Sequence, residues 1–207
     1  MSIPLSSGAK VMFTGDSITD CRRLETDNPL GYGYPLRVAG QWAFAHPDRS
    51  PDWLNSGISG NRVADLTQRW QTDVLDQQPD VLSVLVGIND CGFRYSLDFP
   101  EVPTAEYEDG YSALLAPLAA AGVRLILIEP FLLPVNDDQR RWREDLDPKI
   151  QAVRDLARRY NAELIAADGM FAELAAETGP EYWAADGVHP TAAGHQALAE
   201  AWLRHVV

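Results

Sequence analysis

The 207-residue chain has the length and the ordinary hydrophobic (46%) and charged (23%) fractions of one globular domain, which we expect to span residues 1–207. Its formal net charge of -13 argues against nucleic acids and anionic membrane surfaces as partners and suits a neutral ligand. The sequence contains neither a signal-peptide pattern nor an apolar run of membrane-spanning length, so we expect a cytoplasmic protein.

Apolar runs of strand length alternate with amphipathic segments along the whole chain. This alternation predicts a parallel α/β sheet with right-handed crossovers, and no repeat or linker divides it. We expect strands beginning at Val11 and over residues 52–55, 81–86, 123–128 and 163–167. Helices are expected over residues 31–45, 62–75, 104–120, 145–160, 170–178 and 191–205.

Two long segments between these elements have the composition of loops. One runs from the end of the third strand to Pro103, and the other begins at Pro130. The helix after the second loop is expected to begin at Asp145 or Leu146. That start would place Pro148 in the first turn, where proline is tolerated.

Small and polar residues follow each of the first three predicted strands. These clusters contain Ser17, Gly60 and Asn89 in turn. In open parallel sheets, ligands bind outside the carboxyl ends of the strands. We therefore expect the three clusters to converge at one edge of the sheet, although they lie far apart in the sequence.

Ser17 is a candidate nucleophile, but a serine after a strand often caps a helix or forms a turn instead. Residues 14–19 could also form a phosphate-binding loop at a helix N-terminus. Against that alternative, Asp16 would place negative charge beside the phosphate, and neither glycine-rich phosphate-binding pattern is present. Because a serine hydroxyl is a poor nucleophile without an adjacent base, the interpretation depends on a histidine.

His189 is the best candidate for this base among the four histidines. Asp186 lies three residues before it, and Pro190 favours an extended backbone at position 189. This spacing can place a carboxylate against one imidazole nitrogen while the other faces a nucleophile. A helix-entry turn or half of a metal site would also fit, but no companion His or Cys cluster is present, so we expect no metal ion and no cofactor. The other three histidines lie in predicted helices or at their ends, where exposed or capping roles suffice: His46, His195 and His205.

Acyl transfer also needs hydrogen-bond donors aimed at the oxyanion that develops. Gly60 lets a backbone N–H approach closely, and Asn89 can present a side-chain amide from the end of the third strand. Each residue alone is also an ordinary turn residue. Their occurrence together with Ser17 and His189 favours a serine hydrolase.

The two cysteines, Cys21 and Cys91, are too few for a disulfide framework, and we expect free thiols. A cysteine nucleophile would need a nearby base and an activating environment. The sequence leaves this alternative open.

The ordered blocks Gly15-Asp16-Ser17, Gly60, Gly87-Ile88-Asn89-Asp90 and Asp186-x-x-His189 resemble the four signature blocks of the GDSL/SGNH hydrolase superfamily. The resemblance implies a flavodoxin-like three-layer α/β/α sandwich with a mainly five-stranded parallel sheet. It also implies Ser17 as nucleophile, His189 as base and Asp186 as the orienting acid. The implied oxyanion hole consists of the Ser17 and Gly60 backbone N–H groups and the Asn89 side chain.

Longer motifs resemble the intracellular acetylxylan-esterase branch, whose members remove acetyl groups from xylo-oligosaccharides. This resemblance implies an acetylated oligosaccharide as substrate and suggests a homo-oligomer. Arg62 departs from the threonine common in that branch. The motifs are Phe13–Cys21, Gly31–Tyr34, Asn55–Asn61, Asp65–Leu66 with Arg69–Trp70, and Val86–Asp90.

Two other functions remain open at this point. One is a lipase or thioesterase of broader acyl specificity, and the other is a non-catalytic carbohydrate-binding module. The segments Phe93–Glu101 and Pro134–Trp142 carry aromatic and basic residues that could form walls for sugar stacking, or could be buried or face another subunit.

Overall fold

In the computed structural model, which describes residues 2–207, five parallel strands form one sheet in the order β2-β1-β3-β4-β5. This is the flavodoxin-like order, in which the direction of winding reverses between β1 and β3. The strands are β1 (Lys10–Gly15), β2 (Asp52–Asn55), β3 (Val81–Leu85), β4 (Arg124–Ile128) and β5 (Glu163–Ile165).

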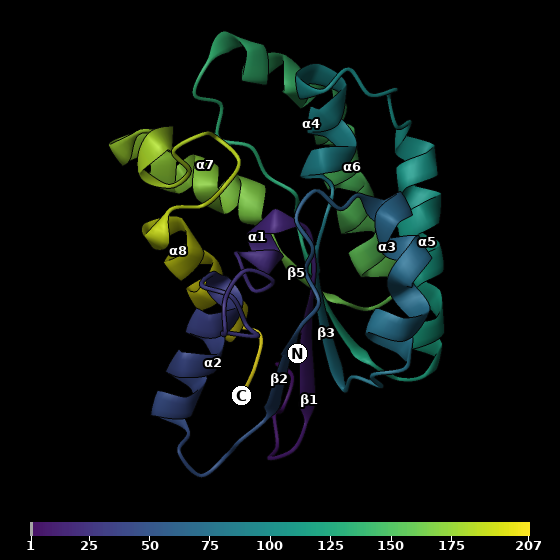
Figure 1. The fold of residues 1–207 in the computed structure, drawn as a ribbon, viewed down its shortest axis with the longest axis vertical. Helices are drawn as coiled ribbons and strands as arrows, with labels where there is room; N and C mark the ends of the chain where they lie inside the picture. The colour runs from purple at the N-terminus through teal and green to yellow at the C-terminus, as the bar shows by residue number, and fades with distance from the viewer. Residues whose placement is uncertain (1) are drawn as a thin grey trace.

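Helices cover both faces of the sheet, which confirms the predicted three-layer sandwich (Figure 1). On one face lie α2 (Tyr34–Ala45), α7 (Ala167–Thr178) and α8 (Ala192–Leu203). On the other lie α3 (Val63–Trp70), which continues into a π-helical turn at Gln71–Leu75, α5 (Thr104–Ala120) and α6 (Asp137–Arg159). The short α1 (Ser17–Asp20) follows β1, and α4 (Ile88–Ser96) follows β3.

The hydrophobic core is divided by the sheet into two clusters. Successive side chains of a strand point to opposite faces, so Phe13 joins the cluster under α2 and α8 while Met12 joins the cluster under α3 and α5. The strands are buried on both sides, which explains their nearly continuous apolar sequences.

Two of the predicted loops are largely helical, and the sequence-based expectation was wrong there. Residues 88–96 form α4, and α6 begins at Asp137 rather than at Asp145 or Leu146. Asn136 caps α6 by accepting a hydrogen bond from the Gln139 N–H at 2.9 Å. Pro148 therefore lies inside the helix, on its exposed side. The other predicted elements are present, with ends shifted by less than about one helical turn.

Among the residues that the structure describes, no helix combines the length and the apolar character needed to cross a membrane.

Candidate active site

Ser17, Gly60 and Asn89 all lie at the carboxyl edge of the sheet, next to the point where the winding reverses. Ser17 opens α1 directly after β1, and Asn89 lies in the first turn of α4 after β3. Gly60 lies between β2 and α3 with a φ of 82°, which favours glycine. The expected convergence of the three clusters is present.

Ser17, His189 and Asp186 form a continuous chain of hydrogen bonds. The Ser17 Oγ lies 2.9 Å from His189 Nε2, and His189 Nδ1 lies 2.7 Å from Asp186 Oδ2. Because an ionised carboxylate can only accept, Nδ1 carries the imidazole proton and leaves Nε2 free to accept from the serine hydroxyl. This geometry suits transfer of the Ser17 proton to His189.

Asp186 is held in its ionised form by its hydrogen bonds. Burial alone would raise the pKa of Asp186, but the His189 ring and the backbone N–H groups of His189 and Val188 outweigh burial and lower this pKa. The two N–H groups donate to Asp186 Oδ1 at 2.7 and 2.9 Å. One carboxylate oxygen thus orders the turn while the other orients the imidazole.

Gln139 ties this turn to the start of α6, a contact that the sequence analysis missed. Its Nε2 donates to the Asp186 carbonyl oxygen at 2.6 Å, and its Oε1 accepts from the Val135 N–H at 2.9 Å. Gly187 has a φ of 85°, and a Cβ there would lie 2.6 Å from Gln139 Oε1. The spacing Asn136-x-x-Gln139, typical of a helix N-terminus, is the sequence signal for this start.

Asn89 is oriented by a backbone carbonyl. Its Nδ2 donates one hydrogen bond to the Asn61 carbonyl oxygen at 3.0 Å. Since an amide nitrogen carries two hydrogens, the second remains for a ligand oxygen. Asn89 can therefore serve as an oxyanion donor in this orientation.

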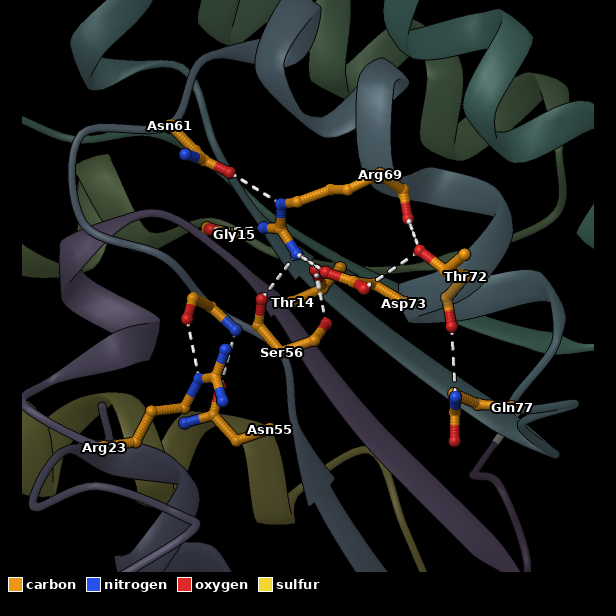
Figure 2. Close-up of polar contacts among 11 residues, drawn as sticks. Thr14, Gly15, Arg23, Asn55, Ser56, Asn61, Arg69, Thr72, Asp73 and Gln77 are labelled. Atoms are coloured by element: carbon orange, nitrogen blue, oxygen red, sulfur yellow. Dashed lines mark hydrogen bonds and ion pairs between the residues drawn. The ribbon is translucent and has the colours of Figure 1, made fainter. Parts of the chain in front are cut away.

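Arg69 holds Asn61, the residue that follows Gly60 in the chain (Figure 2). Its Nε donates to Asn61 Oδ1 at 2.7 Å, and its Nη1 donates to the Ser56 carbonyl oxygen at 2.7 Å. A longer contact of 3.3 Å reaches the Gly15 carbonyl oxygen at the end of β1. One guanidinium thus fixes the ends of β1 and β2 and the residue that orients Asn89.

Two buried aspartates flank the site. Burial raises the pKa of Asp16 to about 7, although its Oδ1 accepts from the Ile18 N–H at 3.0 Å. Burial likewise raises the pKa of Asp90 to about 7, even though the Val63 N–H and the charge of Lys149 oppose this shift. The Asp90 carboxylate accepts from the Val63 N–H and so connects α4 to the start of α3.

The environments of the cysteines disfavour a cysteine nucleophile. Burial raises the pKa of the Cys91 thiol to about 12 and also raises the pKa of Cys21. Cys21 Sγ lies 3.5 Å from His195 Nε2, while the Tyr34 N–H donates to His195 Nδ1 at 3.2 Å. Nε2 of a neutral His195 therefore carries the proton and cannot activate the thiol. The expectation of an exposed or capping His195 was wrong, because only 6% of it is exposed.

The segment Pro134–Trp142 does not form an exposed aromatic wall. Trp142 lies in α6 and stacks on Tyr95 of α4, with ring centroids 5.8 Å apart and an interplanar angle of 17°. A Cβ at Gly92 would lie 2.8 Å from this indole. The ring therefore serves mainly to pack α4 against α6.

Comparison with known proteins assigns the family. The sequence model of the GDSL-like lipase/acylhydrolase family matches residues 13–197. The chain belongs to this family. A curated acetylxylan esterase from Geobacillus stearothermophilus is 36% identical over 210 residues, which cover 98% of this chain and 95% of that protein.

Solved structures agree with this assignment. The crystal structure of the Geobacillus acetylxylan esterase matches with a TM-score of 0.90 at 36% identity, over 99% of this chain and 96% of that one. A candidate GDSL-like lipase from Parabacteroides merdae matches with a TM-score of 0.91 at 31% identity, over 99% and 98%. The GDSL-family chain described here is accordingly a carboxylic ester hydrolase.

Proposed function

We propose that this GDSL hydrolase is a serine esterase that removes acetyl groups from small acetylated sugars, such as xylo-oligosaccharides. The observation that carries the proposal is the hydrogen-bonded chain from Ser17 through His189 to Asp186. Ser17 acts as the nucleophile, His189 as general base and then general acid, and Asp186 keeps the imidazole in the required tautomer.

In the first step, Ser17 Oγ attacks the ester carbonyl carbon while its proton moves to His189 Nε2. The carbonyl oxygen becomes an oxyanion that accepts hydrogen bonds from the Ser17 and Gly60 backbone N–H groups and from Asn89 Nδ2. The tetrahedral intermediate then collapses as His189 returns the proton to the leaving alcohol oxygen. An acyl group remains on Ser17.

In the second step, water attacks the acyl-enzyme. His189 accepts a proton from this water, and the same donors stabilise the second oxyanion. Collapse of this intermediate returns the proton to Ser17 Oγ and releases the carboxylic acid. The enzyme is regenerated without any other reactant.

Two further observations support a sugar ester as substrate. The side chains of His189 and Asp186 are 55% and 57% exposed, so a bulky alcohol can extend from the leaving-group side into solvent. The relatedness to the Geobacillus acetylxylan esterase supports acetyl as the acyl group. A cytoplasmic location stays a prediction from the sequence patterns, and assembly into a homo-oligomer stays a prediction from the sequence resemblance.

The test compares nitrophenyl esters that differ only in their acyl group. We expect higher kcat/KM on nitrophenyl acetate than on nitrophenyl octanoate, and mass-spectrometric loss of acetyl groups from acetylated xylo-oligosaccharides. Ser17→Ala should reduce both reactions by at least about 1000-fold.

A preference for octanoate would instead identify a lipase or thioesterase. Absence of turnover on every activated ester would identify a non-catalytic sugar-binding module, and either result would overturn the proposal.

A further inference from the structure

We infer that the ring of Phe93 is the wall that limits the length of the acyl group, an inference that rests on the proposed function. Phe93 lies four residues after Asn89 in α4, and side chains at this spacing share one face of a helix. Side chains of a helix also lean toward its N-terminus, which brings the Phe93 ring toward Asn89. From this spacing we place the ring near Asn89, the side-chain donor proposed for the oxyanion.

The other donor lies against the same ring. A Cβ placed on Gly60 would be 3.8 Å from Phe93 Cζ, which is van der Waals contact. Gly60 comes from the loop after β2 and Phe93 from the helix after β3. The ring therefore lies close to Gly60 and, by helix geometry, one turn of α4 beyond Asn89.

The segment that follows α4, together with Arg62, supports the Phe93 ring. The backbone folds back after α4, so that the N–H groups of Leu97 and Phe99 both donate to the Phe93 carbonyl oxygen, at 3.0 and 3.1 Å. The Phe99 ring packs on the Phe93 ring with centroids 5.5 Å apart. The Arg62 guanidinium carbon lies 5.2 Å from the Phe99 ring centroid. Arg62 in turn forms an ion pair with Asp65 at 3.1 Å. Arg62 and Phe99 together therefore support the Phe93 ring.

The direction of the acyl group follows from the chemistry of the tetrahedral intermediate. Its leaving oxygen must face His189 Nε2 to receive a proton, and its oxyanion must face Gly60 and Asn89. His189 precedes α8, and α7 and α8 lie on one side of α1 while α4 lies on the other (Figure 1). The remaining substituent, the acyl group, points away from both His189 and the oxyanion donors. We place it against the Phe93 ring, one helical turn beyond Asn89 in α4, while the alcohol leaves past the exposed His189.

This arrangement also gives Arg62 a defined place. The Arg62 guanidinium lies over the Phe99 ring, and the Phe99 ring packs on the Phe93 ring. We therefore expect the space in front of the ring to accommodate a methyl group, and a longer acyl chain to displace the ring. The wall therefore favours acetyl over longer acyl groups without any charged contact.

The test is Phe93→Ala, assayed on nitrophenyl acetate, butyrate, hexanoate and octanoate. We expect the ratio of kcat/KM for long over acetyl esters to rise about fourfold for each methylene that the opened space admits, or tenfold or more for hexanoate. Phe93→Leu, which keeps an apolar side chain of intermediate size, should raise the ratio by less. It also replaces Phe93→Ala as the test if that variant does not fold.

Tyr95→Ala is the matched control, because it removes an aromatic ring from the same helix on the side that packs on Trp142. Its ratio should equal that of the wild type. An unchanged ratio in both Phe93 variants would overturn the inference, as would a selective loss of activity on acetylated sugars, which would place the ring against the alcohol. Because Ser17→Ala tests esterase activity separately, either result can be told apart from a failure of the proposed function.

Discussion

Replacing Gln139 by glutamate tests whether the Asp186–His189 turn is positioned by α6. The substitution keeps the shape of the side chain and the oxygen that accepts from the Val135 N–H at 2.9 Å. It replaces the Nε2 donor, 2.6 Å from the Asp186 carbonyl oxygen, by a second oxygen that cannot donate when ionised. The backbone of the orienting acid then loses its partner from α6.

The expected magnitude has a stability part and a catalytic part. Leaving a part-buried acceptor without its donor costs about 1 kcal/mol, the lower end of the range for buried groups, and each kcal/mol lowers the Tm of a domain of this size by about 2–4 °C. A displacement of a catalytic group by about 1 Å can cost about 100-fold in rate. We therefore expect kcat to fall about 10- to 100-fold, with a smaller change in KM.

The assay measures kcat and KM on nitrophenyl acetate across the pH range, together with Tm. The pH profile of kcat should shift, because Asp186 no longer holds the imidazole in the same geometry. Asn136→Ala is the matched control: it removes the cap of the same helix, at a cost of about 1 kcal/mol, but leaves the contact to Asp186. If Asn136→Ala lost as much kcat as Gln139→Glu, the effect would be one of helix stability, and the positioning role would be refuted.

Two other substitutions test the oxyanion donor and the buried charge. Asn89→Ala should lower kcat on nitrophenyl acetate by about 100- to 1000-fold. Circular dichroism and Tm should show that the variant is folded. A kcat equal to that of the wild type would exclude Asn89 as a donor. Burial raises the pKa of Asp90 from 3.8 to about 7, so the unfolded chain loses this proton at lower pH than the folded protein does. Stability conferred by Asp90 is therefore present below about pH 4 and declines as the pH rises toward 7. Asp90→Asn retains an oxygen for the Val63 N–H but cannot titrate. In urea unfolding, its free energy of unfolding should therefore fall less between pH 4.5 and 7.5 than that of the wild type. An equal fall in both proteins would contradict this prediction.

The sheet and the placement of the proposed catalytic groups could be predicted because they depend on local patterns. Continuous apolar runs mark strands covered on both faces, and parallel strands bring the residues that follow them to one edge. For this reason Ser17 and Asn89, although distant in sequence, were expected together. The Asp186-x-x-His189 spacing likewise defines a turn on its own.

The helices around the site could not be predicted in full because their signals are mixed. In α4, Gly92 and several polar residues interrupt the apolar periodicity, and the helix is fixed by the packing of Trp142 against Gly92. For α6, the expected start at Asp145 or Leu146 placed Pro148 in the first turn, whereas its exposed position allows it within the longer helix. Because the start of α6 was predicted too late in the chain, Gln139 was not recognised as a residue of this helix.

Contacts between residues far apart in the sequence could not be predicted either. Gln139 and Asp186 are 47 residues apart, and Arg69 and Gly15 are 54 residues apart. Nothing in either local sequence indicates the partner. The burial of His195 similarly depends on how α8 packs against α2.

The central claim is that Ser17 carries the acyl group, and mass spectrometry of the trapped intermediate tests it most directly. The enzyme is mixed with nitrophenyl acetate, quenched in acid during the pre-steady-state burst and digested. We predict one acetyl group on the peptide that contains Ser17, and none in Ser17→Ala. An acetyl group carried by Cys21 or another side chain during turnover, or undiminished turnover by Ser17→Ala, would contradict the account.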